Sequence, residues 1–150
     1  MKLNHINLCS SDVPALSSFL NRFFDYEVLK AGKVPMPAAD TKAESDYAML
    51  EGVDGSFIVI TEILSPVQPA YPTNFHFGII METPAQVHDK HRELGEAGFH
   101  PEKISEGFEV LGERWTAFYC PIGDGMKIEV NHRTGPAAFR GGRSAASPSS

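Results

Sequence analysis

The chain lacks the features that mark several large protein classes. It has only two cysteines, Cys9 and Cys120, without a C-x-x-C pattern, so neither a disulfide framework nor a zinc ribbon is indicated. Both are expected to be buried free thiols. No apolar run approaches the roughly 20 residues needed to cross a bilayer, and the N-terminus has no apolar signal segment. Lysine and arginine number 13 against 19 acidic residues and form no cluster, which argues against a nucleic-acid partner. We therefore expect a cytoplasmic protein that binds neither membrane nor nucleic acid.

The chain does contain enough apolar sequence for a compact core. Hydrophobic residues make up 42% of its 150 positions and charged residues 21%, which is typical of a globular domain. We expect a single domain over residues 1–134. Residues 135–150 are poor in apolar side chains and are expected to form a largely disordered tail.

The domain repeats its own design at an interval of about 70 residues. His5 and His76 are 71 positions apart, and each lies in a short apolar stretch that leads to a helix start signal. Asp12 is the candidate N-cap of the first helix, with a proline in its first turn. Thr83 is the candidate N-cap of the second, followed at once by Pro84. The repeat predicts two modules of the same construction.

Each predicted helix is followed by three strand-like segments, so each module has the order β-α-β-β-β. The segments cover residues 27–31, 47–50 and 57–64, and then residues 99–104, 115–119 and 126–131. A sheet covered by one helix leaves its other face bare. The sequence therefore predicts an α+β fold in which modules of about residues 1–66 and 73–134 pair into a curled mixed sheet. This sheet would surround a metal-binding cavity, with the helices outside.

Three residues of metal-binding type, His5, His76 and Glu129, each lie in a stretch where polar and apolar residues alternate. Because residues two apart in a strand share a face, the apolar neighbours can face the core while these three side chains face the cavity. Two imidazoles and one carboxylate can hold a divalent metal and leave coordination positions open for a substrate. The pattern predicts a metal site.

These residues resemble the vicinal-oxygen-chelate superfamily, which includes glyoxalase I, fosfomycin-resistance thiol transferases, bleomycin-resistance proteins and extradiol dioxygenases. The resemblance covers about residues 1–133 and rests on segments 4–8, 12–20, 75–79 and 118–129. The turn before the last strand departs from the family's Asp-Pro-Asp-Gly and reads Ile-Gly-Asp-Gly here. Its Asp124-Gly125 pair can still form a hairpin turn.

The resemblance implies a site in which His5, His76 and Glu129 bind Fe²⁺, Mn²⁺, Zn²⁺ or Ni²⁺, a choice that the residue types leave open. Tyr119 stands ten residues before Glu129, as a tyrosine does in the dioxygenases and fosfomycin transferases. It is either a hydrogen-bond donor to a substrate oxygen or a core aromatic residue. Glu62 is either a fourth ligand, as in glyoxalases, or a solvated carboxylate at a strand end.

The function implied by the resemblance is that of a metal-dependent enzyme. Its metal would chelate two adjacent oxygens of a small oxygenated or aromatic substrate, in a dioxygenase-like or lyase-like reaction. A homodimer is expected, because family members with one pair of modules are usually dimers, often with each site built from both chains. The alternative is a metal-free protein that sequesters a drug or another ligand, like the bleomycin-resistance proteins. Those proteins lack the three ligand residues, so metal content distinguishes the two functions.

Overall fold

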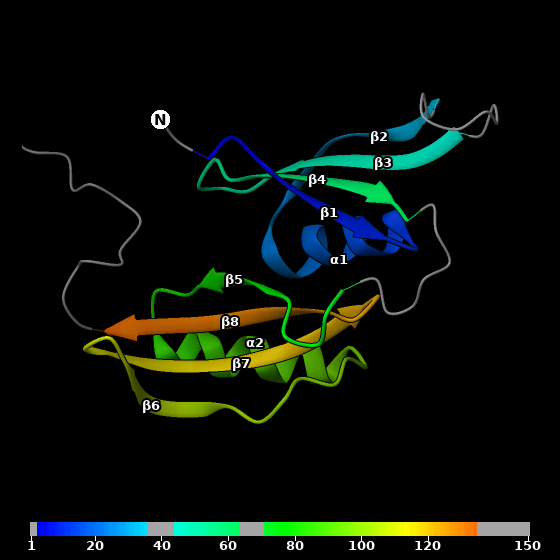
Figure 1. The fold of residues 1–150 in the computed structure, drawn as a ribbon. Coiled ribbons are helices and arrows are strands. Elements are labelled where there is room, and N and C mark those ends of the chain that lie inside the picture. Colours follow the sequence, from blue (N-terminus) through cyan, green and yellow to red (C-terminus); the bar gives the residue numbers. More distant parts are fainter. Residues whose placement is uncertain (1–2, 36–43, 64–70, 135–150) are drawn as a thin grey trace, which may run out of the picture.

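The computed structural model describes residues 3–35, 44–63 and 71–134, which form two consecutive modules (Figure 1). Each module is a strand, a helix and three further strands, so the predicted α+β class and βαβββ repeat are confirmed. The tail predicted over residues 135–150 lies outside the described residues. The elements are β1 (Ile6–Ser10), α1 (Val13–Phe24), β2 (Glu27–Pro35), β3 (Glu44–Glu51), β4 (Phe57–Glu62), β5 (His76–Ile80), α2 (Pro84–Glu96), β6 (Ser105–Val110), β7 (Glu113–Gly123) and β8 (Met126–Thr134).

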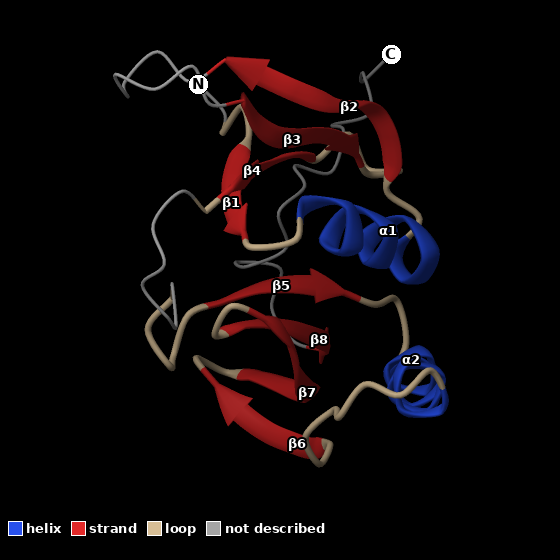
Figure 2. Cartoon of the chain, turned by 90° about the vertical axis from the view of Figure 1, so that its right-hand side faces the viewer, coloured by secondary structure: helices blue, strands red, loops and turns tan. Residues whose placement is uncertain are grey.

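Each module folds into its own four-stranded mixed sheet. The strand order is β1-β4-β3-β2 in the first sheet and β5-β8-β7-β6 in the second. In each sheet the first strand runs parallel to the last, and the other pairs are antiparallel. Among the described residues the two sheets remain separate and do not join into one curled sheet. Helix α1 was expected on the outside but lies between the two sheets (Figures 1 and 2).

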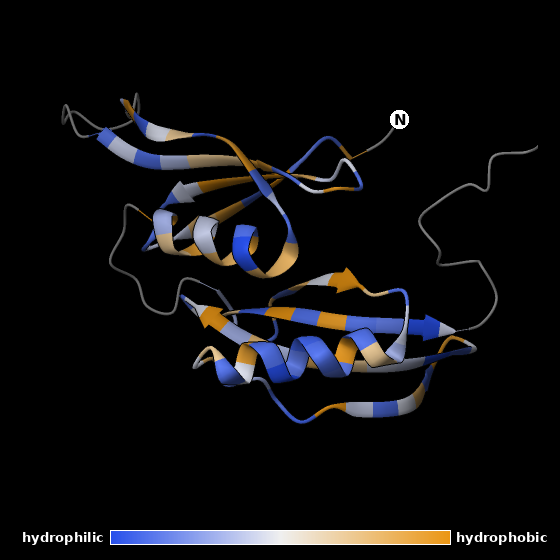
Figure 3. Cartoon of the chain, turned by 180° about the vertical axis from the view of Figure 1, so that it is seen from behind, coloured by the Kyte–Doolittle hydropathy of each residue, from blue (hydrophilic) through white to orange (hydrophobic). Residues whose placement is uncertain are grey.

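Both helices begin at the capping residues that the sequence indicated. The Asp12 carboxylate accepts a hydrogen bond from the backbone N–H of Ala15 at 2.9 Å. Thr83 and Gln86 exchange hydrogen bonds in a capping box, and Pro84 occupies the first helical position. Seen from behind, α2 covers the second sheet and presents mostly hydrophilic residues to solvent (Figure 3). Local sequence is therefore enough to place both helix starts.

Aromatic side chains fasten α1 to the second module. The rings of Phe19 and Phe23 contact that of Phe99, with centroids 4.9 and 5.6 Å apart. The Lys90 ammonium of α2 donates a hydrogen bond to the carbonyl of Phe23 and lies 5.2 Å from the centre of the Phe24 ring. Buried residues of both modules consequently form one continuous hydrophobic core.

The predicted strand over residues 99–104 is wrong, because β6 begins only at Ser105. Phe99 is drawn towards α1 by its ring contacts, and Pro101 has no N–H group to offer a strand ladder. Residues 99–104 instead run as an irregular connection beside β7, where the Glu102 N–H donates to the carbonyl of Tyr119.

The hairpin between β7 and β8 turns at Asp124 and Gly125, whose φ angles of 55° and 83° are those of a type I′ turn. The expected Asp-Gly turn is thus confirmed. The Asp124 carboxylate also accepts hydrogen bonds from the Ser10 hydroxyl and the Ser11 N–H, at 3.1 and 2.9 Å. This turn therefore ties the connection between β1 and α1 to the second sheet.

The outer strands β2 and β6 are open to solvent. β2 is exposed along its whole length and β6 along most of it, and a bulge interrupts the pairing of each with its neighbour.

Cys120 is buried as expected, and burial raises the pKa of its thiol to about 11. Cys9 is only partly buried, contrary to expectation. No helix in the described part of the chain is long and apolar enough to span a membrane.

We predict that Phe19→Ala lowers the free energy of unfolding by about 3–5 kcal/mol, because the ring is 6% exposed and joins both modules. Urea denaturation measures the change. Val53→Ala is the control, since Val53 is 92% exposed, and should alter stability by no more than about 0.5 kcal/mol. Equal losses in the two variants would contradict this packing.

Candidate functional site

The face of the second sheet opposite α2 carries the candidate site, and we call it the site face. Ile128 and Val130 of β8 are fully buried on the α2 side, so the odd-numbered residues of this strand point the other way. In the sheet register Tyr119 of β7 lies on one side of Glu129, and Gly78 of β5 lies on the other. All three consequently belong to the site face.

His76 and Glu129 meet on the site face. The His76 Nε2 and Glu129 Oε2 atoms are 3.3 Å apart, and Glu129 is only 6% exposed. The other ring nitrogen, Nδ1, lies 3.0 Å from the Asn74 carbonyl oxygen. Because that oxygen can only accept, Nδ1 carries a proton, and Nε2 faces the carboxylate. Nε2 is thus the ring nitrogen that could share a cation with the carboxylate.

Asn131 holds the Glu129 carboxylate in place. Its Nδ2 donates a hydrogen bond of 2.9 Å to Glu129 Oε1, which leaves Oε2 for His76. Asn131 is 4% exposed, and a β-carbon at Gly78 would stand only 3.4 Å from its Nδ2. The sequence pattern places Asn131 on the face of Glu129 but gives it no role. The signal that identifies the role is its spacing of two residues from the carboxylate on the same strand face.

Tyr119 also lies at the pair, with its ring edge-on to that of His76 at a centroid distance of 5.2 Å. Burial, followed by the negative charge of Glu129, raises the pKa of the Tyr119 phenol above its ordinary value of 10.0. The phenol therefore stays protonated at neutral pH and offers a hydrogen-bond donor beside the pair.

A cavity of about 270 Å³ opens next to His76 and Tyr119. Lys127 and Glu102 form an ion pair of 2.6 Å along its wall. Lys127 precedes Glu129 by two residues and pairs with His76 in the register. The cavity is lined by Thr73, Asn74, His76, Glu102, Tyr119 and Lys127.

His5 does not join this group within one chain. It precedes β1, in the other module, and is exposed. Over residues 3–35, 44–63 and 71–134, no three histidine, cysteine, aspartate or glutamate side chains gather closely enough to hold a metal. The structure thus brings His76 and Glu129 together and leaves the third predicted ligand elsewhere.

Glu62 ends β4, on the side of the first sheet that carries the buried Ile60 and faces α1. Its carboxylate accepts a hydrogen bond from the Asp46 N–H at 2.9 Å. It therefore lies apart from His76, Glu129 and Tyr119. The roles assigned from the sequence to all of these residues stay predictions.

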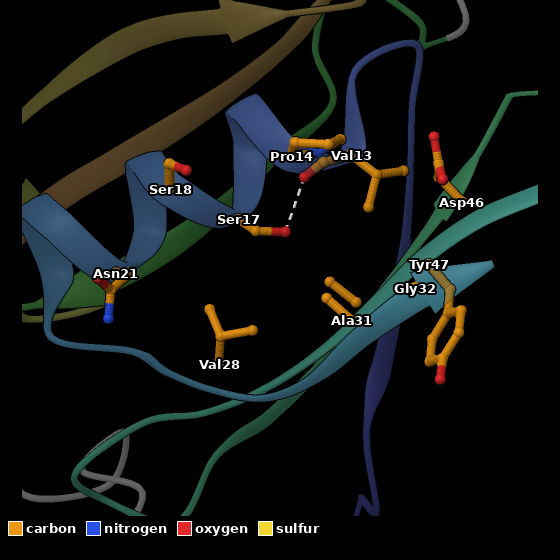
Figure 4. Close-up of a pocket in the computed structure, with 11 residues that line it drawn as sticks. Val13, Pro14, Ser17, Ser18, Asn21, Val28, Ala31, Gly32, Asp46 and Tyr47 are labelled. Carbon is orange, nitrogen blue, oxygen red and sulfur yellow. Dashed lines mark hydrogen bonds between the residues drawn. The ribbon is translucent and has the colours of Figure 1, made fainter.

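A second cavity, of about 340 Å³, lies between α1 and strands β2 and β3 (Figure 4). Its walls are mainly apolar, with Val13 on the helix side and Val28 and Ala31 on the strand side. The Ser17 hydroxyl is already used, because it donates to the Val13 carbonyl at 2.7 Å. The cavity contains no histidine or cysteine, and its one carboxylate, on Asp46, pairs with Lys33. This cavity therefore has no counterpart of the His76–Glu129 pair on the site face.

No protein-family model matches the sequence, and no curated protein matches it significantly. Solved structures do match. A possible glyoxalase from Bacillus cereus is 26% identical, with a TM-score of 0.60, over 87% of this chain and 97% of that chain.

Two further matches have the same fold. The glyoxylase/bleomycin resistance protein/dioxygenase domain from Frankia has a TM-score of 0.63 at 17% identity, over 91% of this chain and 98% of that one. The fosfomycin resistance protein FosX from Listeria monocytogenes, in complex with Mn(II) and sulfate, has a TM-score of 0.61 at 20% identity, over 89% and 93%. The match to the possible glyoxalase confirms the resemblance to the vicinal-oxygen-chelate superfamily, and the two further matches show the same fold.

We predict that Asn131→Ala weakens Mn(II) binding by about 10–100-fold, the usual effect of removing a partner that orients a ligand. Electron paramagnetic resonance of free Mn(II) measures the dissociation constant. Asn74→Ala is the matched control, since Asn74 contacts His76 only through its main-chain carbonyl, and should bind as the wild type does. Equal Mn(II) affinity in the two variants would show that Asn131 does not support metal binding.

Proposed function

We propose that the chain is a metal-dependent enzyme acting on a small oxygenated or aromatic substrate, in a dioxygenase-like or lyase-like reaction. The observation that carries the proposal is the 3.3 Å approach of His76 Nε2 to Glu129 Oε2. A carboxylate as buried as Glu129 is stable only with a positive partner and hydrogen bonds. The pair therefore places two potential ligands side by side, as a cation site requires.

The donor atoms fit a divalent metal. Two ligand atoms, each about 2.1 Å from one ion and separated by a tetrahedral or octahedral angle, stand about 3.0–3.4 Å apart. The proton on His76 Nδ1 leaves Nε2 as the ligating atom, and the Asn74 carbonyl fixes the ring. When bound, the ion would supply Lewis-acid stabilisation of negative charge on two adjacent substrate oxygens.

The remaining residues of the site orient the Glu129 carboxylate or offer hydrogen bonds to the substrate. Asn131 fixes the Glu129 carboxylate through Oε1, so the carboxylate need not reorganise when a ligand arrives. Tyr119 supplies a phenolic proton for a hydrogen bond to a substrate oxygen next to His76. The cavity walled by Lys127 and Glu102 accepts the polar end of a small molecule.

We further propose that His5 is contributed by a second copy of the chain. Because α1 lies between the two sheets, the uncovered face of the first sheet points away from the second module (Figure 2). The site face in turn exposes apolar side chains, with Ile80 53% and Phe108 38% exposed. A two-fold pair of chains could lay the first sheet of each copy over the site face of the other, which would bury these groups twice.

We predict that wild-type protein binds one divalent metal per chain and that His76→Ala lowers the affinity for Mn(II) at least about a hundredfold, more than loss of an outer partner does. Metal analysis and resonance titration measure this. The control is His100→Ala, because His100 is exposed and lies in the irregular connection before β6. Equal metal content in all three proteins, or none in any, would overturn the proposal and favour the metal-free binding protein.

Complementation tests the shared site. His5→Ala and Glu129→Gln should each abolish metal binding alone. An equimolar mixture, after dissociation and reassociation, should recover about a quarter of the wild-type sites, since half of the dimers are mixed and each holds one intact site. Metal content after gel filtration gives the answer. No recovery from a mixture that does form dimers would place each complete site within one chain.

A further inference from the structure

Three buried polar atoms in the described part of the chain have no hydrogen-bond partner, and all three belong to neighbouring residues of β7 and β8. They are Trp115 Nε1, Asn131 Oδ1 and Arg133 Nε. Native proteins rarely leave buried polar atoms unsatisfied without a reason. Two of the three, Trp115 Nε1 and Arg133 Nε, are donors on paired residues, and together they point to an acceptor that is supplied by a ligand.

Arg133 and Trp115 form a stacked pair on the site face. They are partners in the β7–β8 register, and the guanidinium carbon lies 4.6 Å from the centre of the indole. The Phe108 ring lies 6.0 Å from Trp115 and extends the aromatic surface. Arg133 forms no ion pair with any carboxylate of the described residues. A guanidinium that lies over a ring and lacks a carboxylate partner can still form two parallel hydrogen bonds to an oxyanion.

The stacked pair lies on the same face of β8 as the candidate metal ligand. Glu129, Asn131 and Arg133 follow one another at intervals of two residues, so their side chains share that face. Four residues of strand place Glu129 and Arg133 roughly 13 Å apart at their α-carbons. Between the two ends Ala117 pairs with Asn131, and both residues are buried.

The geometry points to a carboxylate-binding subsite at Arg133 and Trp115 for the far end of a planar substrate whose near end carries the two adjacent oxygens. This inference rests on the proposed function. The aromatic surface of Trp115 and Phe108 suits a flat, unsaturated body. A single guanidinium on a chain of formal net charge −6 matches one negative charge, and so favours a carboxylate over a doubly charged phosphate.

Two catechols that differ only in the acid group test the subsite. The probes are 3-(3,4-dihydroxyphenyl)propionate and neutral 4-propylcatechol, titrated anaerobically into Mn(II)-loaded full-length protein by calorimetry. The acid should bind the wild type at least about tenfold more tightly, because a charge-assisted pair is formed. It should also change the fluorescence of Trp115, which is the chain's only tryptophan.

Variants separate the subsite from the metal site. Arg133→Gln should bring the affinities of the two catechols together without changing Mn(II) content or the affinity for 4-propylcatechol. Arg133→Lys should keep part of the preference, since an ammonium retains the charge and loses the fork. Arg92→Gln is the matched control, because Arg92 is an exposed residue of α2 that pairs only with Asp89, and should retain the full preference.

The outcomes distinguish failure of the carboxylate subsite from failure of the proposed function. Binding of Mn(II) and of 4-propylcatechol with no advantage for the acid, or an advantage that survives Arg133→Gln, overturns the subsite alone. Failure to bind Mn(II), or failure of both catechols to bind the loaded protein, overturns the proposed function and the subsite with it.

Discussion

The strict two-residue alternation of β8 is the constraint on which the rest of the structure depends. Ile128 and Val130 are fully buried beneath α2, and each contributes on the order of 2 kcal/mol of hydrophobic stabilisation. Their burial forces Glu129 and Asn131 to the opposite face, since a one-residue slip would place these two polar side chains against α2 in place of the core residues. The packing of α2 thereby fixes the orientation of the candidate site as firmly as it fixes the core.

Local sequence patterns predicted the starts of α1 and α2, the Asp-Gly turn and the faces of β5 and β8. The approach of His76 to Glu129 follows from those faces once β5 pairs with β8. The position of α1 between the sheets was not predictable, because it depends on Phe19 meeting Phe99, 80 residues away. The role of Asn131 was missed because its partner is a side chain. His5 lies in the other module, and its part in the site stays a prediction, because periodicity relates residues within a strand and not between modules or chains.

The His76–Glu129 pair also bears on how a buried carboxylate is tolerated. Taking a charge out of water is costly unless a counter-charge and hydrogen bonds replace the water. His76 Nε2 lies 3.3 Å from Glu129 Oε2 and Asn131 donates a hydrogen bond to Oε1, so each oxygen of the buried carboxylate has a polar partner.

The exposed outer strands β2 and β6 have a further consequence for how chains meet. An unpaired strand edge is a template for indefinite stacking of chains through backbone hydrogen bonds. Here each edge is broken by a bulge and carries charge, with Lys30 and Lys33 on β2 and Glu106 and Glu109 on β6. Growth into fibrils is thereby discouraged at both rims, while the broad faces of the sheets stay available for a closed, finite assembly.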